Sequence, residues 1–587
     1  MGLFWGTALP SDANPENGPQ ASGGGLQGTV FSSHLAPNCF LSGSFRLHNR
    51  GSIASILGIS SPAEQASLSD SELVLLLYRS RGVDCVLSLE GEFAFALWDG
   101  DRNRLFCGRD HMGVGRFYYA ATPRAFHFAS SPVEILRNCA GLERRLNRKK
   151  LAAMAIPRGH NFFDEQTFHE GILSLRPGST LIADGRGIRT QVYWKPEIRP
   201  ELVPQADDEA FSQLRELLFR AVGNSLRGAE RPCVQLSGGL DSSAVTGIAA
   251  HLLQQSSQRL LALAAVLPEE TRNRFSDERG WIEEFRAVPN LDIRFVTAAG
   301  RGPFDLIDDP GNYEHTFLRG VVFYLDDAME DEARAAGADL ALDGMGGEFG
   351  VTTFARGYAL ELLSTLRIAP AIRLLRECRA VTGVSPVRVL GRELLSQMFP
   401  LWGRRPLVYL TAEFQRECEA RPIQPRFWPN HRREQMEMLA SRFRTHAALD
   451  GLRQESPIRH ASPLLDTRLI EFCLAAPGHM KIREGYTRYM IRRAMEGLIP
   501  ERNRWRATKC EFSPDYIVRY AAQIQRARDF VRAIRPKDPV RTVVDVDKLL
   551  ERVSLPEPPR VSWERKILVP TTIALICFLR QFEEFRP

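Results

Sequence analysis

The chain has 587 residues, enough for two to four domains with well-filled cores at roughly 100–200 residues per domain. Apolar residues make up 44% and charged residues 25%, the balance of a soluble globular protein. The net charge of +6 arises from 76 basic and 70 acidic residues spread along the chain, which does not call for a nucleic-acid partner. Ten cysteines without a C-x-x-C pair predict neither a zinc site nor a disulfide framework, and a reducing cytoplasm fits them best.

Targeting and membrane signals are weak. The N-terminus lacks a basic region followed by a long apolar region, and Gly6 stands where a myristoylation pattern needs Ser or Thr. Ile567–Leu579 is apolar, but a membrane span needs about 20 residues and Pro570 interrupts the run. We therefore expect a buried C-terminal helix, a cytoplasmic location and no membrane partner.

The first third of the chain has a strand-like pattern. Residues 1–28 are rich in Gly, Pro, Asn and Ser, and we expect loops with little order there. Glu92–Trp98 alternates in polarity and breaks at Asp99–Asn103, as a strand followed by a turn does. Further short strands are expected at Leu105–Gly108, Phe117–Ala120 and Phe126–Ala129. Pro196–Gln205 then forms a proline-bearing linker.

The rest of the chain alternates helix and strand before it becomes mostly helical. Asp207–Leu226 has the periodicity of an amphipathic helix, and Leu260–Leu267 that of a buried strand. Such alternation predicts an α/β fold with a parallel sheet. Beyond Phe354, apolar residues recur at three- and four-residue spacing through Glu361–Arg379 and Asp466–Ala475, which predicts helices.

The most informative motif follows a predicted strand at Cys233–Gln235. Its glycines, Gly238 and Gly239, let the backbone turn tightly and approach an anion, while its serines supply hydroxyl groups. A helix begins at the apolar run after the loop, so its first amides point at the same place. No Gly-Lys-Ser/Thr closes the loop, which excludes a Walker-type motif. We predict an ATP pyrophosphate-binding loop, although a ligand-free strand-to-helix turn is an alternative. The predicted ATP-binding residues are Leu236, Ser237, Gly238, Gly239, Leu240, Asp241, Ser242 and Ser243.

A second glycine-rich turn, Asp343–Gly350, follows the hydrophobic residues Leu340–Leu342. In a doubly wound sheet, ligands bind beyond the carboxyl ends of the strands, so two such turns can meet over one nucleotide. Asp241 and Glu348 would then hold Mg²⁺ on the pyrophosphate, because hard cations prefer carboxylate oxygen. The turn adds Gly344, Gly346 and Gly347 to the predicted ATP site. An ordinary glycine turn is the alternative.

Together these motifs resemble those of glutamine-dependent asparagine synthetases. The synthetase-like motifs are the loop 237–243, the turn 344–348 and the segment Ser462–Glu471 with the later Lys481, Arg492 and Lys509. The first half resembles the glutaminase domain of these enzymes in Leu89–Asp99, Gly108–Tyr119, Ser174–Gly178 and Tyr193–Trp194. The resemblance implies a glutaminase-like α+β sandwich of the Ntn type over residues 29–195, lacking the nucleophilic cysteine. It also implies a doubly wound, parallel-sheet ATP pyrophosphatase domain with added helices over residues 206–587.

Two departures from that family bear on function. Glutaminase activity needs a cysteine at position two, whose thiol attacks the amide, but this chain has Gly2 and its earliest cysteine is Cys39. We therefore expect the first domain to be a structural scaffold. Met345 falls where asparagine synthetases carry a glutamate, so the acid that they use for substrate or ammonia is missing. The acid at the end of such turns is commonly aspartate, whereas this chain has the longer Glu348.

Two families share this architecture without the cysteine, the β-lactam synthetases and the lasso-peptide isopeptide cyclases, and both form an intramolecular amide from an adenylated carboxylate. Pro477–Tyr489 and Arg504–Tyr516 look most like the lasso cyclases. The implied reaction is ATP-dependent macrolactam formation, in which a side-chain carboxylate of a precursor peptide is adenylated and then attacked by the peptide's N-terminal amine. The resemblance implies a leader-free precursor peptide, a leader peptidase and a leader-recognition protein as partners.

Lys509 is the predicted catalytic cation, because a fixed ammonium is most useful where negative charge develops in the transition state. A basic cluster at Arg483–Arg506 leads to it, and its positive field suits an acidic ligand. Glu348 is the second predicted catalytic residue. No general base is identified; the candidates are Glu348, Asp343, His460 and Glu511, and a neutral amine can do without one.

Other functions stay open. An ammonia-dependent asparagine synthetase or a β-lactam synthetase-like amide ligase would use the same loop. A tRNA-modifying ATP pyrophosphatase would predict a catalytic cysteine pair or an RNA-binding domain, and neither is visible in the sequence. A non-catalytic scaffold would predict loss of Asp241 or of the loop serines, yet all are present.

Overall fold

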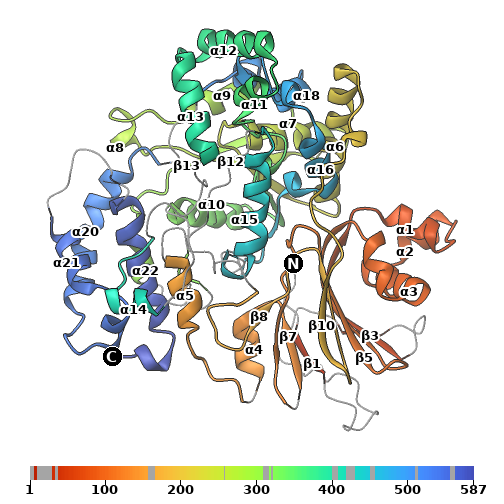
Figure 1. Ribbon diagram of the computed structural model, residues 1–587, viewed down its shortest axis with the longest axis vertical. Helices are drawn as coiled ribbons and strands as arrows, with labels where there is room; N and C mark the ends of the chain where they lie inside the picture. Colours follow the sequence, from red (N-terminus) through yellow and green to blue (C-terminus); the bar gives the residue numbers. More distant parts are fainter. Residues whose placement is uncertain are drawn as a thin grey trace.

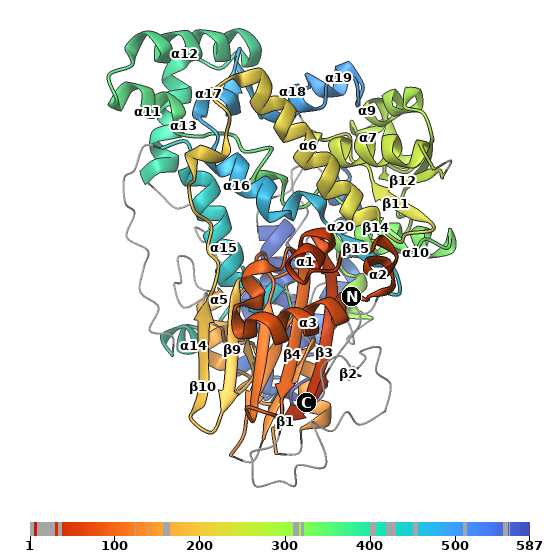
Figure 2. The same ribbon diagram turned by 90° about the vertical axis from the view of Figure 1, so that its right-hand side faces the viewer.

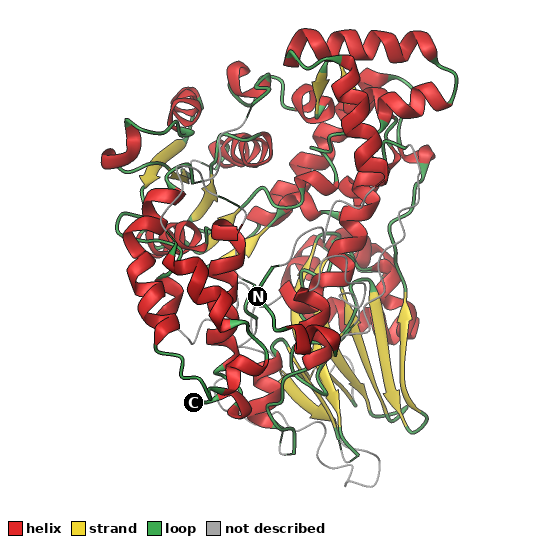
Figure 3. Cartoon of the chain, turned by 60° about the vertical axis from the view of Figure 1, so that its left-hand side comes forward, coloured by secondary structure: helices red, strands yellow, loops and turns green. Residues whose placement is uncertain are grey.

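The computed structural model describes residues 5–8, 30–32, 38–123, 125–139, 141–155, 165–256, 258–308, 316–318, 322–398, 407–417, 430–449, 456–508, 513–555, 562 and 564–587. The N-terminal third forms antiparallel sheets at one end of the molecule, and the remainder forms a parallel sheet surrounded by helices (Figure 1). Figure 3 shows the same division, with the two groups of strands set apart and most helices around the second.

The N-terminal domain contains two antiparallel sheets. The larger has the order β10-β9-β5-β4-β3-β2, with β2 (Val30–Ser32), β3 (Cys39–Leu47), β4 (Gly91–Asp99), β5 (Arg104–Arg109), β9 (Ser179–Asp184) and β10 (Gly187–Val192). The smaller has the order β1-β7-β6-β8, with β1 (Trp5–Ala8), β6 (Tyr118–Ala121), β7 (Phe126–Ala129) and β8 (Leu173–Ser174). The four strands expected between Glu92 and Ala129 therefore form, with ends shifted by at most one residue.

Alternation along β4 explains why the sheets stack. Phe93 and Phe95 belong to a core shared with the helices on the outer face, whereas Ala94 and Ala96 belong to the core between the two sheets. Successive strand residues point to opposite faces, so one strand serves two cores. The helices of this domain are α1 (Arg50–Ile56), α2 (Pro62–Ser67), α3 (Asp70–Arg81), α4 (Pro132–Asn138) and α5 (Arg148–Ala155), of which α1–α3 cover the larger sheet (Figure 2). The predicted α+β sandwich is confirmed.

The expectation of loops throughout residues 1–28 is wrong at one place. Trp5–Ala8 forms β1, which pairs antiparallel with β7 in the register Trp5–Ala129. The glycine- and proline-rich composition of the segment as a whole hid a four-residue strand that gains its hydrogen bonds from a distant partner. The rest of the segment lies outside the described residues.

The C-terminal domain has a five-stranded parallel sheet in the order β13-β12-β11-β14-β15. These strands are β11 (Pro232–Gln235), β12 (Leu260–Ala265), β13 (Leu291–Val296), β14 (Leu340–Leu342) and β15 (Arg459–Ala461). The chain moves outward from β11 in one direction and then returns to add β14 on its other side. The carboxyl ends of β11 and β14 therefore form the switch point of a doubly wound sheet, as predicted, where ligands bind in such folds.

Helices cover both faces of this sheet. The helices α6 (Asp207–Leu226) and α7 (Leu240–Gln254) share a core with Val234, and α10 (Phe323–Ala335) shares the opposite core with Cys233. The other helices are α8 (Glu269–Arg272), α9 (Arg279–Glu283), α11 (Tyr358–Ser364), α12 (Ile368–Thr382), α13 (Pro386–Met398), α14 (Ala412–Arg416), α15 (Arg433–Leu449), α16 (Thr467–Ala475), α17 (Gly478–Lys481), α18 (Tyr489–Ala494), α19 (Glu501–Arg504), α20 (Tyr516–Arg532), α21 (Val546–Ser554) and α22 (Val569–Leu579). Two short strands, β16 (Ile482–Arg483) and β17 (Tyr486–Thr487), form a hairpin.

Two helical predictions need comment. The periodic stretch Glu361–Arg379 is interrupted, because α11 ends at Ser364 and Leu366 has a φ of +58° before α12 begins. The apolar C-terminal segment forms α22 with Pro570 in its first turn, where a missing amide hydrogen costs nothing, and its core-facing residues are buried as expected. Across the part of the chain that the structure describes, no helix combines the length and apolarity needed to cross a membrane.

The two domains meet at α15 and α16. Met112 of the N-terminal domain packs with Leu439, Leu465 and Ile470 in one apolar cluster. The indole Nε1 of Trp194 donates to Glu471 Oε1 at 2.9 Å across the same boundary. The N-terminal domain is thus attached to helices that stand behind the predicted site.

Candidate active site

A pocket of about 290 Å³ lies at the switch point of the parallel sheet. Both predicted turns contribute to its wall, because Asp241 follows β11 and Glu348 follows β14. Of the predicted ATP-binding residues, those that line it are Leu236, Ser237, Gly239, Asp241, Ser242 and Gly344. The others, Gly238, Leu240, Ser243, Gly346 and Gly347, lie in the same two turns without lining the pocket.

The loop after β11 is held closed by its own serines. Ser242 Oγ accepts a hydrogen bond from the Ser237 amide at 3.1 Å and lies 3.0 Å from the Ser237 hydroxyl. Gly238 has a φ of +67°, a conformation that side chains other than glycine rarely adopt. These contacts join residues 237 and 242, so the loop makes a tight turn and the first residues of α7 lie at the pocket.

Ser243 supplies the clearest indication that this loop binds a ligand. Its hydroxyl oxygen is buried and has no hydrogen-bond partner among the described residues. Buried polar atoms are normally paired, so an orphaned one at the N-terminus of a 15-residue helix points to a missing acceptor. The first amides and the dipole of α7 favour negative charge at this end of the helix, where Ser242 lines the pocket and Ser243 lies just behind it in the chain.

The glycine turn packs directly against Asp241. A Cβ on Gly347 would overlap Asp241 Oδ1, and a Cβ on Gly344 would lie 2.7 Å from the Ser242 amide nitrogen. Thr352 Oγ1 donates to Asp241 Oδ1 at 2.6 Å, which fixes the carboxylate from the side of the turn. The glycines are therefore required by close approach of the two turns.

The carboxylate donors suit Mg²⁺ carried on a phosphate. Asp241 and Glu348 line the same pocket, and Mg²⁺ in such sites takes one or two carboxylates and completes its shell with phosphate oxygens and water. No group of three or more His, Cys, Asp or Glu residues with metal-site geometry occurs in the described ranges, so the protein offers no complete cage there. The donor set fits ATP·Mg²⁺ better than a resident metal.

A buried ion pair beneath the loop was not anticipated from the sequence. Arg506 Nη2 donates to Glu278 Oε1 at 2.7 Å, and its Nη1 donates to the Gly238 carbonyl at 3.3 Å. The guanidinium carbon lies 4.3 Å from the centre of the Trp281 ring. Arg506 falls in the basic cluster noted above, but Glu278 lies in a segment without a periodic or glycine-rich pattern. Only the fold brings the two together.

The far wall of the pocket is a second polar cluster, formed by Asp515 and Arg519 of the α20 region. Arg519 Nε donates to Asp515 Oδ2 at 2.8 Å, and its other nitrogens donate to backbone carbonyls of Thr297, Ala298 and Arg301. Ser513 Oγ donates to Asp515 Oδ1 at 2.9 Å. This arginine is therefore fully used in holding the wall. Lys509 and Glu511, predicted as catalytic cation and candidate base, lie outside the described residues.

The other candidate bases, Asp343 and His460, differ in whether they line the pocket. Asp343 lines the pocket and accepts a hydrogen bond from the Met345 amide at 2.9 Å, which shapes the glycine turn. His460 does not line it; its Nε2 lies 3.0 Å from Glu330 Oε2 on α10. The structure thus keeps Asp343 and Glu348 at the site and does not bring His460 there.

The cysteines of the N-terminal domain give no replacement for a terminal nucleophile. Gly2 lies outside the described residues. Cys39 is buried in β3, and burial raises the pKa of its thiol, which disfavours the reactive thiolate. All eight described cysteines are buried. The role of this domain as a scaffold stays a prediction.

Comparison with known proteins gives two family matches. Residues 213–579 match the asparagine synthase family, and residues 51–194 match the glutamine amidotransferase domain. A Bacillus subtilis protein named asparagine synthetase [glutamine-hydrolyzing] 3 is 33% identical over 223 residues, which cover 37% of this chain and 36% of that protein. A Gibberella zeae protein named amidase chry2 is 33% identical over 32% of this chain and 28% of its own length. Asparagine synthetase [glutamine-hydrolyzing] 1 of B. subtilis is 22% identical over 74% of this chain and 69% of that protein. The alignments thus span only about a third of the first two relatives.

Proposed function

Because the chain belongs to the asparagine synthase family, we propose that it is an ATP-dependent carbon–nitrogen ligase that releases AMP and pyrophosphate. One observation carries this proposal. Asp241 and Glu348, from two different strand ends, line one pocket beside a helix N-terminus where Ser243 keeps an unpaired hydroxyl. A non-catalytic scaffold would have no need for that arrangement.

The source of the attacking amine can be inferred from the residues at positions 345 and 2. Met345 lines the pocket and is 45% exposed, so an uncharged side chain stands where asparagine synthetases carry a glutamate. Ammonia or the amino group of free aspartate would find no carboxylate at that position. Gly2 offers no thiol to release ammonia from glutamine. These features favour a substrate that brings its own amine.

We therefore infer that the product is a macrolactam in a leader-free precursor peptide, of the lasso type. ATP·Mg²⁺ binds over Ser237–Ser243, with Asp241 and Glu348 as the Mg²⁺ ligands. When bound, Mg²⁺ held by these carboxylates would supply positive charge beside the departing pyrophosphate. A side-chain carboxylate oxygen of the peptide attacks the α-phosphorus and displaces pyrophosphate, which leaves a mixed anhydride with AMP. The N-terminal amine then attacks that carbonyl carbon, expels AMP and loses a proton.

The main contribution of the protein to the second step would be positioning. Holding amine and activated carbonyl together replaces a bimolecular encounter and can supply about 7–11 kcal/mol. Lys509 is proposed to stabilise the charge that develops on the α-phosphate and the tetrahedral carbon. Under this proposal a leader peptidase and a leader-recognition protein supply the trimmed peptide.

An ammonia-dependent asparagine synthetase is the second candidate, because two of the relatives above are named asparagine synthetase [glutamine-hydrolyzing], and one of them aligns over 74% of this chain. Without the cysteine at position two, such an enzyme would use free ammonia. The two candidates differ in the nucleophile and share the adenylation step. Both therefore predict pyrophosphate release, and only the product separates them.

The test is product mass with purified protein, ATP·Mg²⁺ and the leader-free peptide encoded nearest its gene. Aspartate with ammonia is the parallel reaction. A peptide lighter by one water, with one AMP formed per ring, is expected. Asparagine in the parallel reaction alone would replace the macrolactam proposal with the second candidate. Pyrophosphate release in neither reaction would contradict the ligase proposal for both substrates.

A further inference from the structure

The turn that carries Glu348 is supported from behind by a buried glutamine. Gln435 lies in the first turn of α15 and is fully buried, at 0% exposure. Its Nε2 donates to the Phe349 carbonyl at 3.0 Å and lies 3.5 Å from the Gly350 carbonyl. Gln435 is therefore hydrogen-bonded to the backbone directly after Glu348.

The other end of that glutamine is held by a buried lysine. Lys481, at the end of α17, is 1% exposed, and its Nζ donates to Gln435 Oε1 at 2.6 Å. That oxygen is the only hydrogen-bond acceptor of the Lys481 amine within the described residues. An N–H of the Lys481 amine, present in both its charged and its neutral form, donates to the amide oxygen of Gln435, and the amide nitrogen is thereby turned toward the Phe349 carbonyl.

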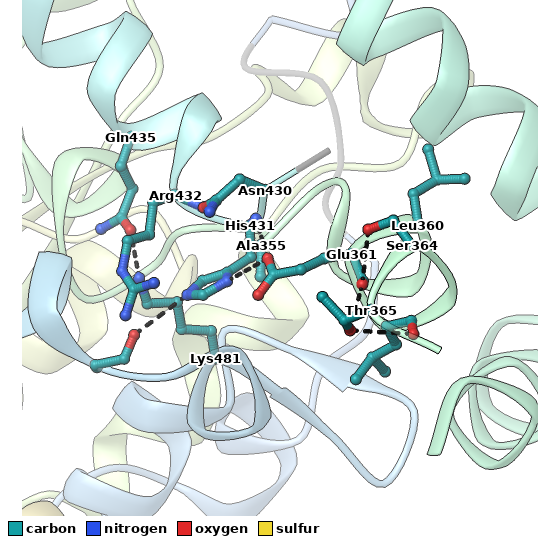
Figure 4. A network of polar contacts seen from close by, with 12 residues as sticks. Ala355, Leu360, Glu361, Ser364, Thr365, Asn430, His431, Arg432, Gln435 and Lys481 are labelled. Atoms are coloured by element: carbon teal, nitrogen blue, oxygen red, sulfur yellow. Dashed lines mark hydrogen bonds and ion pairs between the residues drawn. The ribbon is translucent and has the colours of Figure 1, made fainter. Parts of the chain in front are cut away.

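Lys481 lies beside His431, Arg432 and Glu361 (Figure 4). His431 Nδ1 lies 2.7 Å from Glu361 Oε2, and Arg432 donates to the carbonyls of Leu474 and Ala475. The nearby carboxylate is thus occupied by the histidine, and the arginine adds positive charge. Among the described residues no acid pairs directly with Lys481, although a buried ammonium costs several kcal/mol when unpaired.

We propose that Gln435, oriented by Lys481, is a positioning residue that fixes the turn 347–350 and thereby the metal-binding carboxylate of Glu348. This inference rests on the proposed function, since it assigns the ATP·Mg²⁺ site a support. A pair with a purely structural role could have been apolar, because an apolar pair of the same volume would fill the core without burying an ammonium. The hydrogen bond to the turn is what an apolar pair cannot provide.

Burial and nearby charge also change the titration of Lys481. Burial is the main cause that lowers the pKa of Lys481 to about 7, and Arg432 lowers it further, while Cys473 and Glu361 act in the opposite direction. The Cys473 thiol stays protonated because burial raises its pKa to about 12, and burial lowers the pKa of His431 to about 4. Lys481 is therefore the group in this cluster that titrates near neutral pH.

The test compares Gln435→Met with Gln523→Met. Gln523 also bridges two groups, since it accepts from the Phe304 amide at 2.9 Å and donates to Asp305 at 2.6 Å, but it does not contact the turn. Binding of a non-hydrolysable ATP analogue is measured by calorimetry with and without Mg²⁺, alongside thermal unfolding. In Gln435→Met we expect Mg²⁺ to tighten analogue binding about tenfold less than in the wild type, with metal-free binding unchanged. Gln523→Met should keep the wild-type Mg²⁺ effect.

Equal Mg²⁺ effects in the two variants would overturn the inference. If Gln435→Met does not fold, Lys481→Met serves instead, because it keeps the glutamine and removes only the group that orients it; a wild-type Mg²⁺ effect there would also overturn the inference. Failure of the wild type to bind the analogue at all would instead contradict the proposed function. The two failures are therefore distinguishable.

Discussion

The loop after β5 and the loop after β11 differ in how their polar side chains are hydrogen-bonded. In the N-terminal domain, Asp110 follows β5 and accepts hydrogen bonds from the amides of Met112, Val114 and Gly115 at 2.6–3.1 Å. The neighbouring Arg109 is fully buried and donates to three backbone carbonyls and a serine hydroxyl. In the loop after β11, by contrast, Ser243 is buried and its hydroxyl has no partner among the described residues.

The difference separates a loop built for packing from a loop built for a ligand. A buried donor left unpaired costs about 1–3 kcal/mol, so it is retained where something else pairs with it. In the loop 109–115 the charged side chains of Arg109 and Asp110 are hydrogen-bonded within the protein, while His111 Nδ1 is buried without a partner among the described residues. The loop places Met112 against α15 and α16. Chemistry is thus expected from the C-terminal domain, and support from the N-terminal one.

The strongest test of this contrast is Asp241→Asn. The amide keeps the shape of the carboxylate and can still accept from Thr352, but it loses the charge needed to bind Mg²⁺. We expect ATP-dependent pyrophosphate release to fall on the order of a thousandfold with an unchanged circular dichroism spectrum. Asp292→Asn, an exposed change on β13, is the control. Equal activity of the two variants would remove Asp241 from the site.

Gly347→Ala tests the close approach of the two turns. The added methyl group would overlap Asp241 Oδ1 and displace that carboxylate, so ATP·Mg²⁺ affinity should fall on the order of a hundredfold. Gly350→Ala, in the same turn, is the matched control, because its nearest neighbour, Cys473, would lie 3.7 Å from the new Cβ. Titration calorimetry measures both. Unchanged affinity in Gly347→Ala would contradict the packing described here.

Arg109→Met tests the packing loop. Four hydrogen bonds are lost and Asp110 is left buried beside an apolar side chain, so the free energy of unfolding should fall by about 3–5 kcal/mol. Nucleotide affinity of the folded protein should stay close to that of the wild type. Denaturant unfolding and calorimetry measure the two quantities. Loss of nucleotide binding without loss of stability would place this loop in the ligand site.

The glycine-rich turns of the site can be predicted from the sequence, but contacts between residues far apart in the chain cannot. Asp241 and Glu348 were predicted because glycines, hydroxyls and acids at strand ends form a local pattern. Glu278 was not, because its role depends on Arg506, which lies 228 residues later in the chain. Trp5–Ala8 was missed similarly, since a four-residue strand depends on its partner β7. His460 was a candidate base in the sequence, but in the structure it pairs with Glu330 of α10 and does not line the pocket.

The last prediction concerns pH and the buried Lys481. Its pKa is about 7 in the folded protein against 10.5 when exposed, so between these values the unfolded chain holds a proton that the folded protein lacks. The free energy of unfolding should therefore rise with pH across this window, by up to about 1.4 kcal/mol per unit, with the cost of the buried charge fully present below pH 7.

Denaturant unfolding at several pH values from 7 to 10 measures this slope. Lys481→Met should lose that part of the slope, because methionine has no proton to release. An identical pH dependence in wild type and variant would show that Lys481 keeps its ordinary pKa.

The central claim is that the C-terminal pocket activates a carboxylate with ATP, and the nucleotide products test it most directly. The purified protein, ATP·Mg²⁺ and the leader-free peptide are incubated, and the products are separated by ion-exchange chromatography. We predict equal amounts of AMP, pyrophosphate and cyclised peptide, all formed on the order of a thousandfold more slowly by Asp241→Asn. Formation of ADP and phosphate, or amide formation by Asp241→Asn at the wild-type rate, would contradict the account.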